Sequence, residues 1–288
     1  MEAGEYAQTT LSSALPMGGH WQKIESNPVI FNELLRTIGV RGAHAEEVYT
    51  IDEEFFNTLR KAQVYGFILL LRHKNQHTRT VAPSGIDYSN VYFANQVIPD
   101  ACATQAILSV VLNAPQLDIG PSLRRFKDFT ADFSPKDDKN AMGIEEDDEE
   151  DPFHYIAYVP IDGHTWELDG LRPAPVRLDP YDESDWLSAF RKELVAKIEK
   201  YSTDEAGFVL MAIMQDPVDA LMTEQQQQQI QLERGEEVDP EQVQRLEKEL
   251  EIKLNDRARE QLEIGEKTAD FRPFLNRFIT LLRAHGKV

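Results

Sequence analysis

The chemistry of this chain starts from its only cysteine, Cys102. A single cysteine cannot form an internal disulfide, and a lone cysteine in a chain with several histidines is a candidate nucleophile. An inert core thiol is the alternative, because free cysteine is among the most buried residue types. Asp100 is a natural N-cap, so we expect Cys102 in the first turn of a helix over residues 100–113. Unpaired N–H groups and the helix dipole stabilise a thiolate there and lower the pKa of the thiol.

Gln96 lies just upstream of this expected helix and is a second candidate functional residue. When a thiolate attacks a carbonyl, negative charge develops on the oxygen, and hydrogen-bond donors around that oxygen stabilise the transition state. The helix start supplies backbone N–H groups, and the Gln96 amide would add a side-chain donor. A surface amide on a strand is the alternative interpretation of Gln96, and position alone leaves both open.

A thiolate enzyme also needs an imidazole that accepts and returns a proton, and the chain has seven histidines. His154 differs from the others because it lies on an apolar, strand-like segment, where a polar ring needs a partner. His164 lies beside an expected turn. The remaining five are assigned to tail, loop or terminal contexts: His20, His44, His73, His77 and His285. A hydrogen-bonded core histidine is the alternative interpretation of His154.

An expected β-hairpin supplies a partner for His154. The strand-like segments 153–160 and 164–171 flank Asp162-Gly163, the dipeptide most typical of a two-residue hairpin turn. In this register His154 faces Leu171, and Asp169 is its diagonal neighbour on the same face. Diagonal neighbours lie roughly 7–8 Å apart, within reach of these side chains. Asp169 can therefore hold the imidazole tautomer, whereas Glu167 shares the face but lies one pair further away.

The remaining patterns predict an α+β fold with a mostly antiparallel central sheet flanked by helices. Residues 29–38 have apolar side chains at helical spacing after the capping residue Asn27 and Pro28. Residues 64–71 form a continuous apolar run typical of a buried strand. Residues 184–201 and 203–215 are interpreted as helices.

The composition changes along the chain and divides it into four parts. Residues 1–19 are interpreted as a flexible N-terminal tail, and 20–216 as the main domain. Residues 217–245 form a polar, Gln- and Glu-rich connector or helix. Residues 246–288 are interpreted as a helical C-terminal extension, ending in a short amphipathic helix that begins near Pro273.

Charge and composition exclude several functional classes. The formal net charge of −20 argues against nucleic-acid binding, which requires clustered Lys and Arg. No window approaches the roughly 20 apolar residues of a membrane span, and no secretory signal is evident, so we expect a cytoplasmic or nuclear protein. The acidic run 145–151 lacks the spaced ligands and glycine of a calcium loop and is interpreted as a solvated loop. One cysteine and scattered histidines give no zinc spacing, and no cofactor is expected.

Several segments resemble one enzyme family. Residues 93–106 read FANQVIPDACATQA, residues 153–155 read FHY, and residues 167–171 read ELDGL. They resemble the active-site motifs of the ubiquitin C-terminal hydrolases, papain-like cysteine proteases that release ubiquitin from its adducts. Trp21 to Glu33 and the run RGA at 41–43 resemble the ubiquitin-contacting start of that family. The resemblance covers about residues 20–215.

The resemblance implies a function and roles for particular residues. Cys102, His154 and Asp169 would form the catalytic triad, Gln96 would donate to the oxyanion, and residues 134–152 would form a crossover loop that substrate must thread or displace. Ubiquitin and its conjugates would be the partners. Residues 208–213, FVLMAI, and the terminal RPFL at 272–275 resemble the proteasome-associated 37-kDa type, which has a C-terminal helical extension.

Two departures from the family pattern leave an alternative open. The family has a further helix between the nucleophile helix and the crossover loop, and Phe126 to Pro152 shows no counterpart. The Lys- and Glu-rich tail through which relatives dock on a proteasomal receptor also has no counterpart up to Val288, so that docking is an expectation only. The leading hypothesis is a deubiquitinating thiol hydrolase. The alternative is a catalytically weak or inactive ubiquitin-binding or scaffolding subunit.

Overall fold

The computed structural model describes residues 27–72, 86–95, 102–130, 153–182, 185–201 and 208–266. The strands are β1 (Ala43–Glu47), β2 (Val64–Arg72), β3 (Phe153–Ile161), β4 (His164–Leu168), β5 (Val176–Pro180) and β6 (Val209–Gln215). The helices are α1 (Pro28–Thr37), α2 (Glu53–Leu59), α3 (Cys102–Val111), α4 (Gly120–Thr130), α6 (Trp186–Tyr201), α7 (Pro217–Glu233) and α8 (Pro240–Glu266).

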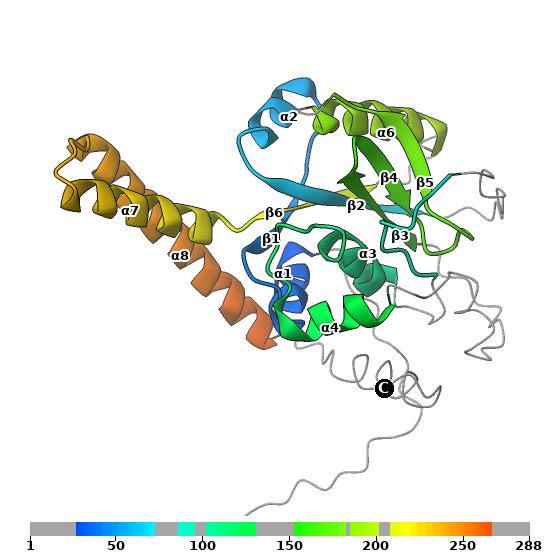
Figure 1. The fold of residues 1–288 in the computed structure, drawn as a ribbon, viewed down its shortest axis with the longest axis horizontal. Coiled ribbons are helices and arrows are strands. Elements are labelled where there is room, and N and C mark those ends of the chain that lie inside the picture. The colour runs from blue at the N-terminus through cyan, green and yellow to red at the C-terminus, as the bar shows by residue number, and fades with distance from the viewer. Residues whose placement is uncertain are drawn as a thin grey trace, which may run out of the picture.

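The strands form one sheet with the order β1-β6-β2-β3-β4-β5, and every neighbouring pair is antiparallel. Helices cover both faces (Figure 1). One core contains side chains of α1, α3 and α4, and the other contains side chains of α2 and α6. Along β2, for example, Ile68 belongs to the first core and Leu69 to the second. The predicted α+β class with an antiparallel central sheet is confirmed.

Helix α3 lies close against the sheet because β2 has a glycine beneath it. A Cβ atom at Gly66 would lie 2.7 Å from the Tyr158 carbonyl oxygen and 2.9 Å from Cγ1 of Val110 in α3. Both distances are shorter than van der Waals contact, so no side chain fits at this position without displacing a neighbour. The absence of a side chain at residue 66 thus sets how closely the helix that begins at Cys102 approaches the sheet.

Two local predictions are confirmed. Asn27 caps α1, because its Oδ1 accepts from the Val29 N–H at 2.9 Å. The β3–β4 hairpin has the expected register, in which Ile161 pairs with His164 and Ala157 with Leu168. Its turn residues both have positive φ, 48° at Asp162 and 73° at Gly163, as a type I′ turn requires.

The helix predicted over 203–215 is wrong, because residues 209–215 form β6. This strand lies between β1 and β2, so its side chains are buried on both faces. Leu210 and Ala212 belong to the core beneath α2 and α6, whereas Met211 and Ile213 belong to the opposite core. A strand buried on both faces needs a continuous apolar run, which periodicity cannot distinguish from a buried helix.

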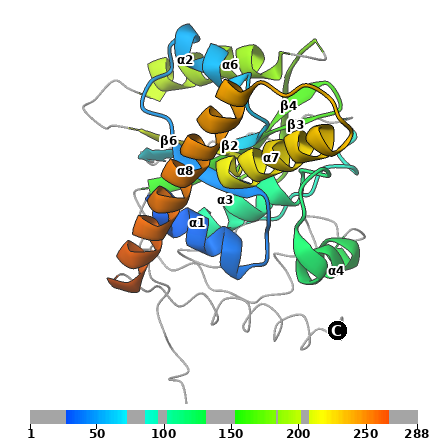
Figure 2. The ribbon, with the colours of Figure 1, turned by 90° about the vertical axis from the view of Figure 1, so that its left-hand side faces the viewer.

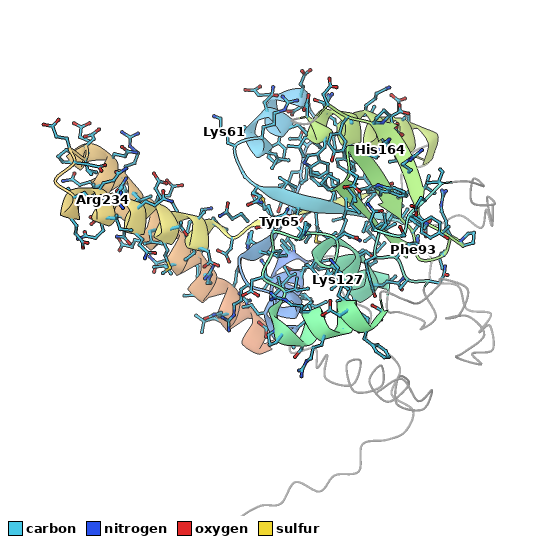
Figure 3. The ribbon with its side chains drawn as sticks, in the orientation of Figure 1. Lys61, Tyr65, Phe93, Lys127, His164 and Arg234 are labelled. Carbon is cyan, nitrogen blue, oxygen red and sulfur yellow. The ribbon has the colours of Figure 1, made fainter. Side chains whose placement is uncertain are left out.

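Beyond β6 the chain forms a helical hairpin of α7 and α8. Asp216 caps α7 through its side chain, and α8 runs back to contact α1 (Figure 2). Arg257 of α8 forms an ion pair with Asp216 and so ties the two helices together near the sheet. Arg234 lies at the far end of the hairpin (Figure 3). The expected division at residue 245 falls within α8, and the helix expected near Pro273 lies outside the described residues.

Other sequence-based expectations concern parts of the chain that the structure leaves undescribed. These are the tail at 1–19, the cap Asp100 and the crossover loop at 134–152. The segment 126–152, in which the sequence shows no counterpart of the further family helix, is described only as far as Thr130, and residues 126–130 are the last residues of α4. Within the described residues, no helix combines the length and apolarity needed to cross a membrane.

Candidate active site

The expected nucleophile lies at the start of α3. Cys102 is the first residue of that helix, and its side chain is only 8% exposed. Helix α3 packs against β2 and β3, so Cys102 is carried by the element that contacts the strand of His154. A thiol at a helix N-terminus experiences the partial positive charge of the unpaired N–H groups. Gln96, the expected oxyanion donor, lies outside the described residues.

Hydrogen bonds from two asparagines and a glutamine fix the segment that leads towards Gln96. The Asn113 amide donates to the Tyr92 carbonyl and accepts from the Tyr92 N–H, both at 2.8 Å. Gln105 of α3 donates to the Ala94 carbonyl. Asn95, which is buried, donates to the carbonyl of Arg172. Residues 92–95 are therefore held between the nucleophile helix and the turn that follows Asp169.

His154 and Asp169 form a buried pair at one end of the β3–β4 hairpin. His154 lies on β3 opposite Leu71 of β2, and Nε2 of its ring lies 2.6 Å from Oδ1 of Asp169. The two residues are 6% and 8% exposed. The diagonal contact expected from the hairpin register is thus present in the structure. Because Nε2 faces the carboxylate, any proton exchanged between this ring and a nucleophile would pass through the other ring nitrogen, Nδ1.

Several donors keep Asp169 ionised despite its burial. Burial by itself would raise the pKa of this carboxyl group. The hydrogen bond and charge of His154 act against burial, as do the Leu171 N–H at 3.0 Å from Oδ1 and the Arg172 guanidinium. Together they lower the pKa from 3.8 to about 2. Asp169 is therefore an anion at neutral pH.

The other candidates on the hairpin have different partners. Glu167 accepts from the Tyr158 hydroxyl at 2.9 Å and lies 2.5 Å from Lys197 of α6. His164 lies beside the turn, with Nδ1 3.0 Å from the Asp162 carbonyl oxygen. Sequence reasoning placed His44 in a tail, loop or terminal context, which is wrong. His44 lies on β1 opposite Met214, and burial lowers the pKa of its ring.

The sequence reasoning missed Arg172. Its Nε lies 3.3 Å from Oδ2 of Asp169, on the side of the carboxylate away from His154. The sequence feature that could have indicated this contact is a cation three residues after Asp169. In the structure the two residues lie in one turn, which is closed by a hydrogen bond from the Arg172 N–H to the Asp169 carbonyl at 2.9 Å. Among the described residues, no group of three or more His, Cys, Asp and Glu side chains is arranged to hold a metal ion.

The family follows from comparison with known proteins. A family model described as ubiquitin carboxyl-terminal hydrolase, family 1, matches residues 21–199, which include α1 to α3, both strands of the hairpin and most of α6. The chain belongs to this family. It is therefore a cysteine-type deubiquitinating enzyme, and the buried pair lies within the matched region.

Two relatives show how far the similarity extends. The chain is 36% identical to ubiquitin carboxyl-terminal hydrolase isozyme L5 of Dictyostelium discoideum over 219 residues, which are 68% of this chain and 62% of that protein. It is 30% identical to the hydrolase ubh-4 of Caenorhabditis elegans over 294 aligned positions, with 94% of this chain and 89% of the relative covered. The similarity to ubh-4 thus continues through most of the C-terminal helices of this hydrolase.

Solved structures give the same result. The fold is similar to the crystal structure of Trichinella spiralis UCH37 bound to ubiquitin vinyl methyl ester, with a TM-score of 0.67 and 33% identity. That alignment covers 84% of this hydrolase and all of the other chain. The catalytic domain of the same Trichinella protein matches at 36% identity, with a TM-score of 0.59 over 69% of this chain.

Proposed function

We propose that this hydrolase cleaves the bond that follows the C-terminal glycine of ubiquitin, with Cys102 as nucleophile, His154 as general base and Asp169 as the residue that orients the imidazole. The observation that carries the proposal is the buried 2.6 Å contact between His154 and Asp169, beside the helix whose first residue is the chain's only cysteine. The UCH37 structures with a ubiquitin derivative support ubiquitin as the substrate.

The reaction proceeds in two steps. The Cys102 thiol passes its proton to Nδ1 of His154, and the thiolate sulfur bonds to the carbonyl carbon of the terminal glycine. The resulting imidazolium is stabilised by the Asp169 carboxylate at Nε2 and protonates the leaving amine as the C–N bond breaks. Water then gives a proton to the imidazole, its oxygen attacks the thioester, and the thiol and the ubiquitin carboxylate are released.

Negative charge on the attacked oxygen requires donors. The N–H groups of the first turn of α3 have no intrahelical acceptors and point along the helix axis towards its start. We assign the Gln96 side chain as a further donor, because the bonds from Gln105, Asn113 and Asn95 fix the residues immediately before it. Removal of one such donor costs on the order of 10²- to 10³-fold in kcat in other hydrolases.

An activity-based probe tests the proposal. The parent enzyme should form a covalent adduct with ubiquitin vinyl methyl ester and release fluorophore from a ubiquitin–fluorophore conjugate. Cys102→Ala should do neither, yet should bind ubiquitin with a Kd within a few-fold of the parent, because the thiol is a reactant and contributes little contact area. Adduct formation by Cys102→Ala would contradict the assignment of the nucleophile.

The same experiment separates the alternative function. A scaffolding or ubiquitin-binding subunit would bind ubiquitin but would leave both the probe and the conjugate unreacted. That result for the parent chain would replace the hydrolase proposal by the alternative, and the buried pair of His154 and Asp169 would then be a core hydrogen bond. Histidine and aspartate pairs of that kind also occur outside active sites.

We also propose that the C-terminal helices bind a proteasomal receptor subunit. The proposal rests on the sequence resemblance to the proteasome-associated type and on exposed apolar side chains of α7 and α8. These are Met222, Ile230, Leu232, Ile252, Leu254 and Leu262. Purified receptor should bind the parent chain, and Leu262→Asp, a change at the most exposed of these side chains, should weaken binding without affecting turnover. Equal binding by both proteins would contradict this surface.

A further inference from the structure

A buried glutamate lies next to the proposed triad. Glu167 is on β4, its side chain is almost fully buried, and each of its carboxylate oxygens has partners. Oε2 accepts from the Tyr158 hydroxyl at 2.9 Å and lies 2.5 Å from Nζ of Lys197. Oε1 lies 3.2 Å from Nη2 of Arg172. Burial and the neighbouring Glu167 charge raise the pKa of Tyr158 well above 10, so Tyr158 stays protonated and donates.

The Arg172 guanidinium connects this glutamate to the catalytic aspartate. Its Nη2 faces Glu167, and its Nε lies 3.3 Å from Oδ2 of Asp169. A planar guanidinium that bridges two carboxylates in this way fixes the orientation of both. Oδ1 of Asp169 is thereby left to His154 and the Leu171 N–H. The two oxygens of Asp169 are thus divided between the imidazole and the guanidinium.

The charges alternate along the whole chain of contacts. Lys197, Glu167, Arg172 and Asp169 follow one another with separations of 2.5, 3.2 and 3.3 Å, and His154 follows at 2.6 Å. Loss of the Glu167 or Arg172 side chain would leave a neighbouring buried charge without its partner, which is strongly unfavourable. The chain begins on α6, which packs against β4. These contacts connect Asp169 to a side chain of a helix that carries no residue of the proposed triad.

We propose that Arg172 and Glu167 are positioning residues that hold Asp169 against His154, and that Lys197 extends this network to α6. The inference rests on the proposed function, because it assigns a role in that reaction. A different role would be purely structural, in which the ion pairs only attach α6 to the sheet. In that case kcat and the environment of the His154 ring would not respond to the loss of one charge in a folded variant.

Two lysines of α6 provide a matched test. The Lys197 side chain is 13% exposed and reaches Glu167, whereas the Lys192 side chain is 77% exposed and pairs with the exposed Asp179. Lys197→Met should lower kcat on the order of 10-fold, because a small displacement of catalytic groups is costly. Its ubiquitin Kd should be unchanged, since only 13% of the Lys197 side chain is exposed. Lys192→Met, with the same change on the same helix, should leave both quantities at parental values.

Nuclear magnetic resonance reports the position of Asp169 directly. The Nε2 proton of His154, held in a short buried hydrogen bond, should give a downfield signal that Asp169→Asn removes. Lys197→Met should shift or broaden this signal, and Lys192→Met should not. A folded Lys197→Met variant with parental kcat and a parental ring-proton signal would overturn the inference. Failure of the parent enzyme to react with ubiquitin vinyl methyl ester would instead overturn the proposed function, so the two failures are distinguishable.

Arg172 keeps the inference testable if Lys197→Met does not fold, because its side chain is 27% exposed and its truncation creates no closed cavity. Among the residues that the structure describes, the charged and titratable groups linked to Asp169 by these contacts are His154 and Tyr158 of β3, Glu167 of β4, Arg172 of the turn and Lys197 of α6. Loss of the guanidinium charge raises the pKa of the Asp169 carboxyl group, so the carboxylate is protonated at higher pH.

Arg172→Gln should therefore lower kcat several-fold. It should also move the acid limb of the pH–stability profile, where the ionised Asp169 carboxylate stops contributing to the free energy of unfolding, to higher pH. Arg172→Lys keeps the charge and should retain most of kcat and the parental acid limb. A parental kcat and pH profile in Arg172→Gln would overturn the inference. Equal defects in the Gln and Lys variants, without a shift of the acid limb, would also overturn it, because they would indicate damage that does not depend on the charge.

Discussion

Replacement of Asp169 by asparagine perturbs one atom of the site. In the parent, Oδ1 of Asp169 accepts from His154 and Leu171, and Oδ2 accepts from Arg172. Asparagine has one acceptor oxygen and a donating NH₂ group. It can accept from His154 and Leu171 or from Arg172, but its NH₂ group then faces a donor on the other side. No rotation of the amide satisfies both sets of partners.

The expected loss of stability follows from the pKa of Asp169. The folded-state pKa of about 2 is below the ordinary value of 3.8. At roughly 1.4 kcal/mol per pKa unit, the ionised carboxylate contributes about 2 kcal/mol to the free energy of unfolding at neutral pH. Because the folded pKa is depressed, this contribution is present above about pH 4 and is lost as the pH falls towards 2. Domains are typically stable by about 5–15 kcal/mol, so the variant should remain folded.

The expected loss of activity is much larger than the loss of stability. Removal of the orienting carboxylate allows the wrong imidazole tautomer, which costs up to about 10⁴-fold in the serine protease example. A thiol is intrinsically easier to ionise than a hydroxyl, so we expect kcat of Asp169→Asn to fall by roughly 10²- to 10⁴-fold. Turnover of a ubiquitin–fluorophore conjugate measures kcat, and urea unfolding between pH 3 and pH 7 measures stability.

Asp179→Asn is the matched control, since Asp179 is an exposed aspartate paired with Lys192 on the surface. This variant should have the parental kcat and stability. A parental kcat in Asp169→Asn would refute the orienting role of Asp169. A difference in unfolding free energy between parent and Asp169→Asn that stays constant from pH 7 to pH 3 would refute the electrostatic account of its stability.

Three further predictions concern other parts of the chain. Gly66→Ala should lower the free energy of unfolding, measured in urea, by about 1–3 kcal/mol, because its Cβ would lie 2.7 Å from the Tyr158 carbonyl oxygen. Parental stability would mean that α3 can move away at no cost. Asn27→Ala should cost about 1 kcal/mol in the same assay through loss of the cap on α1, and an unchanged midpoint would contradict the role of that bond. Replacing the seven acidic residues of 145–151 with Ser and Gly should reduce the salt dependence of kcat/KM, because these acids would no longer attract the basic tail of ubiquitin. Equal salt slopes for the two proteins would mean that this run is a solvated spacer.

The hairpin shows what could be predicted from the sequence alone. A two-residue Asp-Gly turn fixes the register of its strands, and the register places Asp169 diagonally from His154. Local rules also gave α1, β2 and α6, because their signals lie within a few neighbouring residues. The contact between His154 and Asp169 thus followed from local chemistry over residues 153–171.

Long-range structure could not be predicted in the same way. The apolar run of residues 209–215 is compatible with a helix and with a strand, and only its place between β1 and β2 decides for a strand. The sequence around His44 indicates only a tail, loop or terminal context, because the short polar segment 43–47 becomes a strand by pairing with β6. One partner of Glu167 is Lys197, thirty residues away on α6. No local pattern indicates which lysine of that helix turns inward.

The position of β6 has a consequence for how the protein is made. Ribosomes deliver β1 and β2 first, but the strand that separates them comes from residues 209–215, after about half the chain's length has followed β2. The nascent chain therefore cannot complete the sheet until synthesis passes Gln215. Until then β1 has no neighbour in the sheet, and one edge of β2 remains open to pairing with other chains. Contacts this distant in sequence form slowly. We therefore expect the chain to depend on chaperones during synthesis, and truncations before residue 209 to aggregate.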